Sequence, residues 1–238
     1  MTREHFGHKA HTTRKLSADE YVDTRNGEIK QFNHHNNRGA DIRSVKRSLG
    51  HARDLINTNI TDTRRCRFLT LTYAENLTGT ERLYLDFKHF VERCRRRYGY
   101  FEYISIPEPQ GRESWHIHCF FIFKDIAPFM ENSIVASFWK DGFVYITKLD
   151  GVDNVGAYLT SHLSDIELTD DTEDKYDGQI KTVYYEENGE KKSKRFIKGA
   201  RLHLYPPGFN IFRCSRGIKK PTVEEMSYHD AKEKKLPG

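Results

Sequence analysis

The chain has few cysteines and no long apolar run. Its four cysteines, Cys66, Cys94, Cys119 and Cys214, lie far apart and form no CxxC pair. This spacing argues against a cysteine zinc site and offers no disulfide framework, so we expect free thiols in a reducing cytoplasm. No run approaches the length of about 18 apolar residues that a membrane helix needs. The polar N-terminus also lacks the apolar centre of a secretory signal, so we expect no membrane partner.

A phosphate-binding loop is also missing. The pattern GxxxxGK[ST] does not occur, so we expect no ATPase activity in this chain. The charge is only mildly one-sided, because 39 Lys and Arg against 34 Asp and Glu leave a net charge of +5. This basicity favours a polyanionic partner without proving one. The length of 238 residues allows one large domain, or one domain with appendages.

Composition divides the chain into three regions. Residues 1–40 are polar and rich in His, Arg, Asn and Gly, so we expect a flexible arm with weak structure. Residues 41–165 carry the periodic apolar patterns and should form the core. Residues 166–238 should form an extension packed on that core. It opens with an acidic loop, and from residue 191 onward it contains 13 Lys and Arg against four acids.

The apolar periodicity predicts an α+β fold. Helical spacing occurs over 41–57, 82–99, 127–140 and 152–164. Alternating, β-branched patterns that predict strands occur over 67–73, 101–108, 116–123 and 142–149, and 209–214 is strand-like. This order predicts a central antiparallel β-sheet of about five strands flanked by helices.

Two histidines stand at the head of the apolar run WHIHCFFIF, residues 115–123. In a strand, His116 and His118 would share one face, because alternate side chains point the same way. Glu108 ends the preceding predicted strand, and a hairpin would fold it back beside His116. Two imidazoles and one carboxylate suit Mg²⁺, Mn²⁺ or another divalent first-row ion. The alternative is a hydrogen-bonded surface pair, since His-x-His alone is a weak signal.

A later segment, GAYLTSHL, offers a phenol near the core face of a predicted helix. Val155, Leu159 and Leu163 form the apolar stripe of that helix. Tyr158 lies about 60° round the helix from this stripe, at the boundary with solvent. Passive packing is the ordinary role of a tyrosine, and position alone does not select one of 13.

Three stretches in this order resemble the motifs of rolling-circle replication initiators: FLTLTY (68–73), PEPQGRESWHIHCFFIF (107–123) and GAYLTSHL (156–163). These initiators belong to the HUH (His-hydrophobic-His) endonuclease superfamily and are encoded by bacterial plasmids, phages and integrated elements. The resemblance covers roughly residues 40–165. It implies a sheet of the kind predicted above, which RRM-like RNA-binding modules also share.

The resemblance also implies roles for single residues. Glu108, His116 and His118 would hold a divalent metal, and Tyr158 would be the nucleophile. The reaction would nick single-stranded or extruded origin DNA, leave a 5′-phosphotyrosine and a free 3′-hydroxyl, and later rejoin the strand.

The third motif departs from the family pattern. The family usually has a lysine three residues after its tyrosine, and Ser161 stands there in this chain. His162 and Lys148 are the candidates to replace that lysine. A second tyrosine four residues on, which some members carry, is also replaced by His162, so this would be a single-tyrosine enzyme.

Basic residues should line the approach of the DNA. The candidates are Arg64, Arg65, Arg67, Arg95, Arg96, Lys192, Lys194, Arg195, Arg213 and Arg216. A helicase and a polymerase of the bacterial host would be the further partners, in its cytoplasm. Two alternatives stay open: a single-tyrosine transposase or relaxase of the same superfamily, and a nucleic-acid-binding module without enzymatic activity.

Overall fold

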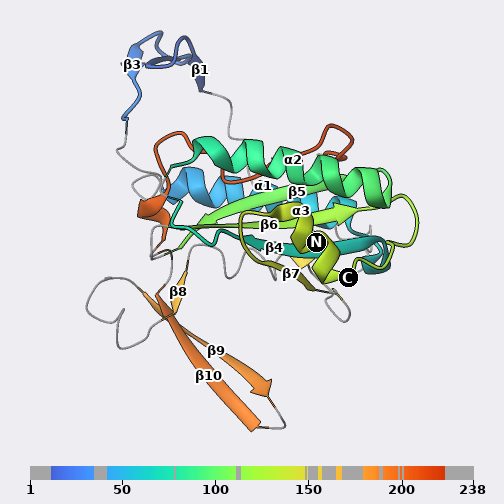
Figure 1. Ribbon diagram of the computed structural model, residues 1–238. Coiled ribbons are helices and arrows are strands. Elements are labelled where there is room, and N and C mark those ends of the chain that lie inside the picture. Colours follow the sequence, from blue (N-terminus) through green and yellow to red (C-terminus); the bar gives the residue numbers. More distant parts are fainter. Residues whose placement is uncertain are drawn as a thin grey trace, which may run out of the picture. The chain divides into compact units, whose positions relative to one another are not determined.

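The chain divides into two compact units, residues 1–35 with 222–238 and residues 36–221 (Figure 1). No helix that is described has both the length and the apolar character needed to cross a membrane. The computed structural model describes residues 12–34, 42–77, 79–110, 114–147, 149, 155–156, 165–167, 179–187, 190–197, 199 and 201–222.

The first unit contains a small antiparallel sheet with the strand order β1-β2-β3. Its strands are β1 (Thr13–Lys15), β2 (Glu20–Asp23) and β3 (Ile29–Gln31). The expectation of weak structure over residues 1–40 is corrected here, because these strands pair. The turn that links β2 to β3 contains Gly27 at φ +73°, a conformation that glycine adopts without steric cost.

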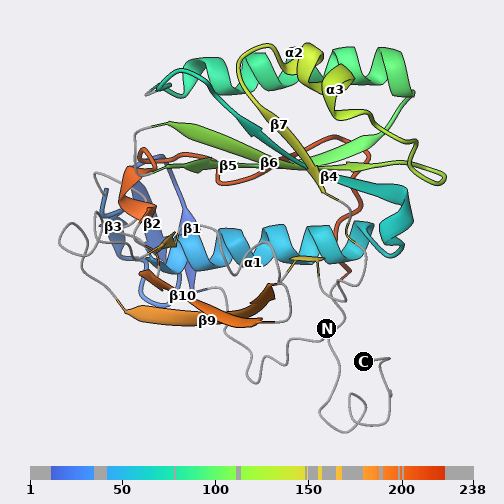
Figure 2. The same ribbon diagram turned by 60° about the horizontal axis from the view of Figure 1, so that its bottom comes forward.

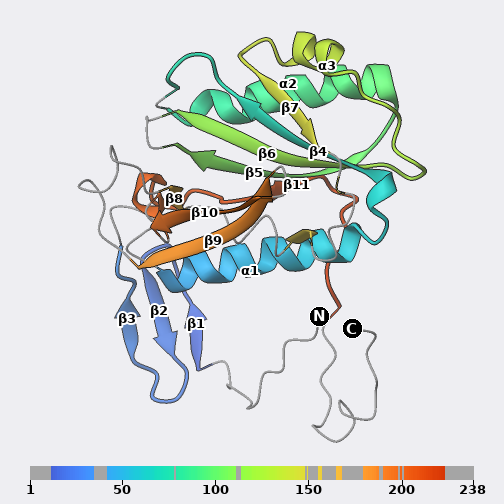
Figure 3. The same cartoon turned by 90° about the horizontal axis from the view of Figure 1, so that it is seen from below.

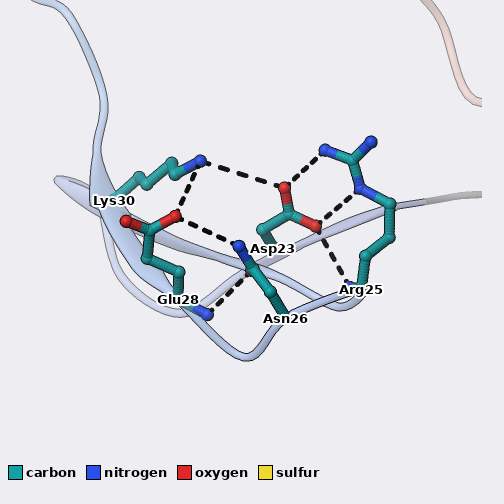
Figure 4. A network of polar contacts seen from close by, with 5 residues as sticks. All are labelled: Asp23, Arg25, Asn26, Glu28 and Lys30. Atoms are coloured by element: carbon teal, nitrogen blue, oxygen red, sulfur yellow. Dashed lines mark hydrogen bonds and ion pairs between the residues drawn. The ribbon is translucent and has the colours of Figure 1, made fainter.

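A polar network closes this turn (Figure 4). The carboxylate of Asp23 accepts hydrogen bonds from the backbone N–H of Arg25 at 3.1 Å and from its Nη2 at 2.6 Å. These bonds hold the pKa of Asp23 well below its usual range. Lys30 Nζ lies 3.0 Å from Glu28 and 3.9 Å from Asp23, and the Asn26 amide donates to Glu28. The network therefore holds the two strand ends together.

The second unit is built on a five-stranded antiparallel sheet with the order β11-β5-β6-β4-β7. This confirms the predicted α+β fold. The strands are β4 (Cys66–Thr72), β5 (Glu102–Pro109), β6 (Trp115–Ile122), β7 (Val144–Thr147) and β11 (Arg213–Cys214).

Helices cover both faces of this sheet (Figure 2). On one face lie α2 (Glu81–Tyr98) and α3 (Asn132–Trp139), and on the other lies α1 (Ile42–Asn59). The buried side chains of α2 recur at helical spacing: Leu83, Phe87, Phe90, Val91 and Cys94. They pack with the odd-numbered residues of β6, whereas Phe120 of β6 packs with α1. The alternation predicted for this strand is confirmed.

Two helix boundaries show how local chemistry sets the elements. The helix α2 ends where predicted, because Gly99 takes φ +82° and its N–H donates to Arg95 O at 3.0 Å. The prediction for α3 was too long at its start. Pro128 disfavours a helical conformation at Ala127, whose N–H donates instead to Arg64 O.

The C-terminal part of the second unit contains an unpredicted hairpin. The strands β9 (Ile180–Glu187) and β10 (Glu190–Ile197) pair along their full length, and β8 (Ile166–Glu167) pairs with β10. The Asn188-Gly189 dipeptide between β9 and β10 is a strong sequence signal for a hairpin.

After this hairpin the chain returns to the central sheet (Figure 3). A 3₁₀ turn, η3 (Leu202–Leu204), is followed by β11, which pairs with β5. Of the strand-like stretch 209–214, only Arg213 and Cys214 form a strand. A second 3₁₀ turn, η2 (Thr63–Arg65), leads into β4.

Candidate metal centre

The register of β5 and β6 brings the three predicted ligands to one place. Glu108 pairs directly with His116 across these antiparallel strands, and His118 follows two residues along on the same face. This is the face covered by α1. The ligand atoms of the three residues all lie within 4.8 Å of one another.

The contacts of His118 hold its ring in place. Its Nε2 lies 3.0 Å from Glu108 Oε2, and its Nδ1 lies 3.2 Å from Thr70 Oγ1. The ring of Phe68 stacks on it, with 5.9 Å between the centroids. Because the Thr70 hydroxyl can either donate or accept, it can partner Nδ1 in both neutral tautomers. His118 can therefore present an unprotonated Nε2 to a metal without losing this support.

The environment of His116 keeps its imidazole neutral. Burial, together with the nearby His118, lowers the pKa of His116 to about 4, although Glu108 acts in the opposite direction. Across the described part of the chain, no hydrogen bond is made to its ring nitrogens. A neutral imidazole with a free lone pair is the form that binds a metal ion.

Two nitrogen donors and one carboxylate oxygen could hold a divalent ion. Imidazole and carboxylate together suit Mn²⁺ and other first-row ions, and the carboxylate also suits Mg²⁺. Glu108 is buried, whereas the two histidines are partly exposed. The group is therefore anchored on the protein side and accessible from the other.

Two further residues contact Glu108 and were missed from the sequence. Gln110 Nε2 donates to Glu108 Oε2 at 3.1 Å, and Arg201 Nη1 lies 2.8 Å from Glu108 Oε1. Gln110 could have been found, because it lies two residues from Glu108 and so on the same face of the strand. Arg201 carries no signal of this kind, because only the folding of a distant segment brings it here.

The predicted catalytic residues Tyr158, His162 and Lys148 lie outside the described residues. Two residues just before Tyr158 are described. Val155 is buried in the same apolar cluster as Phe68, the residue that stacks on His118. The chain therefore reaches the face of the sheet that carries the histidines.

Contacts with α1 fix this point of the chain. The N–H of Gly156 donates to Asn57 Oδ1 at 3.0 Å. A Cβ at Gly156 would lie 2.7 Å from the carbonyl oxygen of Arg53, which is too close for any side chain. The close approach to α1 thus requires glycine.

Some of the predicted DNA-binding arginines are tied into the fold. Arg65, Arg67 and Arg95 donate to backbone carbonyls at 3.2, 2.6 and 2.6 Å. Arg64 pairs with Asp62 at 2.8 Å. A DNA contact by any of these four would compete with these bonds.

The other predicted DNA-binding residues are more open. The side chain of Lys192 lies outside the described residues. Arg213 lies over the ring of Tyr84, 3.1 Å from its centroid. The exposed members of the set are Arg96, Lys194, Arg195, Arg213 and Arg216.

Arg96 lies on the far side of the sheet from the histidines. It lines a hollow of about 560 Å³ between α2 and α3. Arg93, Arg97 and Lys140 line the same hollow. A DNA segment bound there would be separated from the metal centre by the thickness of the sheet.

Comparison with known proteins gives one family. Residues 66–167 match a family model whose description begins "Replication-associated protein ORF2". This match covers less than half of the chain and supports a role as a DNA-binding replication initiator. No curated protein matches the chain, and no solved structure matches it either.

Proposed function

We propose that this protein is a replication initiator of the HUH endonuclease type, which nicks single-stranded or extruded origin DNA. One observation carries the proposal. Glu108, His116 and His118 converge on one face of the sheet, within the residues that match the replication-associated family. The order of the motifs, with the histidines before Tyr158, is that of the rolling-circle initiators.

Each side chain has a role in this proposal. Glu108, His116 and His118 hold a divalent ion, which withdraws charge from a non-bridging oxygen of the scissile phosphate when it is bound. Burial keeps His116 neutral, and Thr70 orients His118, so the donors are prepared before the ion binds.

Tyr158 supplies the nucleophile. Its phenolic oxygen forms a bond to phosphorus, and the bond from phosphorus to the 3′-oxygen breaks. The phenolic proton passes to a base, for which His162 and Lys148 are the candidates, and the 3′-oxygen takes up a proton. The products are a 5′-phosphotyrosine and a free 3′-hydroxyl, which a host polymerase extends. The reverse reaction rejoins a strand.

Adduct formation tests this proposal. The full chain is incubated with single-stranded origin oligonucleotides and Mn²⁺, and covalent protein–DNA adducts are separated on a denaturing gel. We expect Tyr158→Phe to abolish the adduct and to retain DNA binding. His116→Ala should weaken both Mn²⁺ binding and cutting, because it removes a ligand.

Tyr145 provides the matched control. It pairs with Thr70, which in turn pairs with His118, so this exposed phenol lies on the same face about 10 Å from His118. We expect Tyr145→Phe to form the adduct at the wild-type rate. An adduct that survives Tyr158→Phe but is lost in Tyr145→Phe would assign the nucleophile to Tyr145. DNA binding without any adduct would favour the non-enzymatic module.

A further inference from the structure

Arg201 reaches the candidate metal centre from outside the region that matches the replication-associated family. Its Nη1 lies 2.8 Å from Glu108 Oε1, and the two side chains are only 18% and 6% exposed. We propose that Arg201 is a positioning residue, which orients the Glu108 carboxylate for metal binding. This inference rests on the proposed function, because it requires the metal centre.

The two oxygens of Glu108 face different partners. Oε1 faces Arg201, and Oε2 faces His118 Nε2 at 3.0 Å and Gln110 Nε2 at 3.1 Å. Oε2 is therefore the oxygen on the histidine side. A guanidinium that holds the other oxygen fixes the rotation of the carboxylate and directs Oε2 toward the imidazoles.

The segment that carries Arg201 is itself fixed to β5. The hydroxyl of Tyr205 donates to the carbonyl oxygen of Pro107 at 3.1 Å, and Tyr205 is buried. Between Arg201 and Tyr205 the chain forms η3, in which Leu204 N–H donates to Arg201 O. One short segment thus binds the backbone of residue 107 and the side chain of residue 108.

Stability alone gives a weak reason for this arrangement. Burying an ion pair costs desolvation energy that often cancels the attraction between the charges. In addition, the Nε of Arg201 is buried and has no hydrogen-bond partner among the described residues, which costs about 1–3 kcal/mol. A role in orienting Glu108 explains why the arginine is retained.

Metal binding by the DNA-free protein tests the inference. Arg201→Met and Arg201→Lys are made in the full chain, and the Kd for Mn²⁺ is measured by calorimetry. We expect Arg201→Met to weaken Mn²⁺ binding by about 10- to 100-fold, as loss of a carboxylate-orienting partner commonly does. Arg201→Lys should lie between this variant and the wild type, because lysine keeps the charge but lacks the planar fork.

Arg82→Met is the matched control. Arg82 forms ion pairs with Asp86 at 3.4 Å and Asp141 at 3.0 Å, neither of which is a candidate ligand. We expect its Kd for Mn²⁺ to equal that of the wild type. Thermal unfolding in EDTA shows whether each variant is folded; where Arg201→Met is not, Arg201→Lys decides.

Chemical rescue separates positioning from a purely structural role. In Arg201→Ala, added guanidinium ion at low millimolar concentration should restore part of the lost Mn²⁺ affinity, and the same ion should leave Arg82→Met unchanged. A folded Arg201 variant with the wild-type Kd overturns the inference alone. A wild-type protein that binds no Mn²⁺ overturns the metal centre as well.

Discussion

At the scale of single residues, the imidazole of His116 is the group whose charge matters most. Burial and the neighbouring His118 lower its pKa, so the neutral form is favoured in the folded chain. In the metal-free protein we expect His116 to titrate with a midpoint near pH 4 instead of the usual 6.5. Chemical shifts of the ring followed by NMR in the presence of EDTA would measure this midpoint.

This shift also predicts how stability depends on pH. Because the pKa of His116 is lower in the folded state, its contribution is fully present above about pH 6.5 and is lost as the pH falls through about 4. His116→Asn should therefore show a smaller loss of unfolding free energy over this interval. A midpoint near 6.5 for His116 would mean that the ring is solvated and charges freely.

The three candidate ligands could be predicted from the sequence because their placement follows local rules. Alternation along a strand puts His116 and His118 on one face, and a short hairpin returns Glu108 to them. Arg201 could not be predicted in this way, since its contact with Glu108 depends on where a remote turn packs. Local periodicity contains no information of that kind.

At the scale of elements, the packing of Gly156 on α1 is the most demanding contact. We expect Gly156→Ala to displace the segment that leads to Tyr158, because the new Cβ would meet the backbone oxygen of Arg53. Adduct formation should fall at least tenfold, while the Kd for Mn²⁺ stays that of the wild type, since the ligands lie on β5 and β6.

Gly79→Ala is a suitable comparison for this variant. A Cβ at Gly79 would meet only the flexible carboxylate of Glu81, which can move away. We therefore expect normal adduct yield from Gly79→Ala. Normal yield from Gly156→Ala as well would show that this contact does not position the nucleophile.

Elements were predictable where the apolar pattern is strong. The patterns of β4, β6 and α2 gave the right element type, because each has one continuous buried face. The hairpin of β9 and β10 was missed because lysines and glutamates dominate β10, so charge obscured a turn signal at Asn188-Gly189. The early start predicted for α3 failed because Pro128 was given too little weight.

At the scale of the whole molecule, the metal centre depends on more chain than the family match contains. The central sheet and all contacts of Glu108 described above lie within residues 36–221. We expect a fragment of residues 36–221 to unfold cooperatively and to bind Mn²⁺ with the Kd of the full chain.

A second fragment, ending at residue 167, should behave differently. It lacks β11, Tyr205 and Arg201, so one edge of the sheet and the support of Glu108 are lost. We expect this fragment to bind Mn²⁺ at least tenfold more weakly or to be unfolded, as circular dichroism and calorimetry would show. Equal affinity in both fragments would contradict the dependence on the C-terminal segment.

The two histidines lie on β6, the middle strand of the five. Backbone hydrogen bonds flank this strand on both sides, so its amides can exchange with solvent only when the sheet itself opens. Loss of the ion-binding geometry and global unfolding should therefore be a single event. An ion bound at this position would then raise the melting temperature of the whole unit, because its binding energy adds to that of the fold.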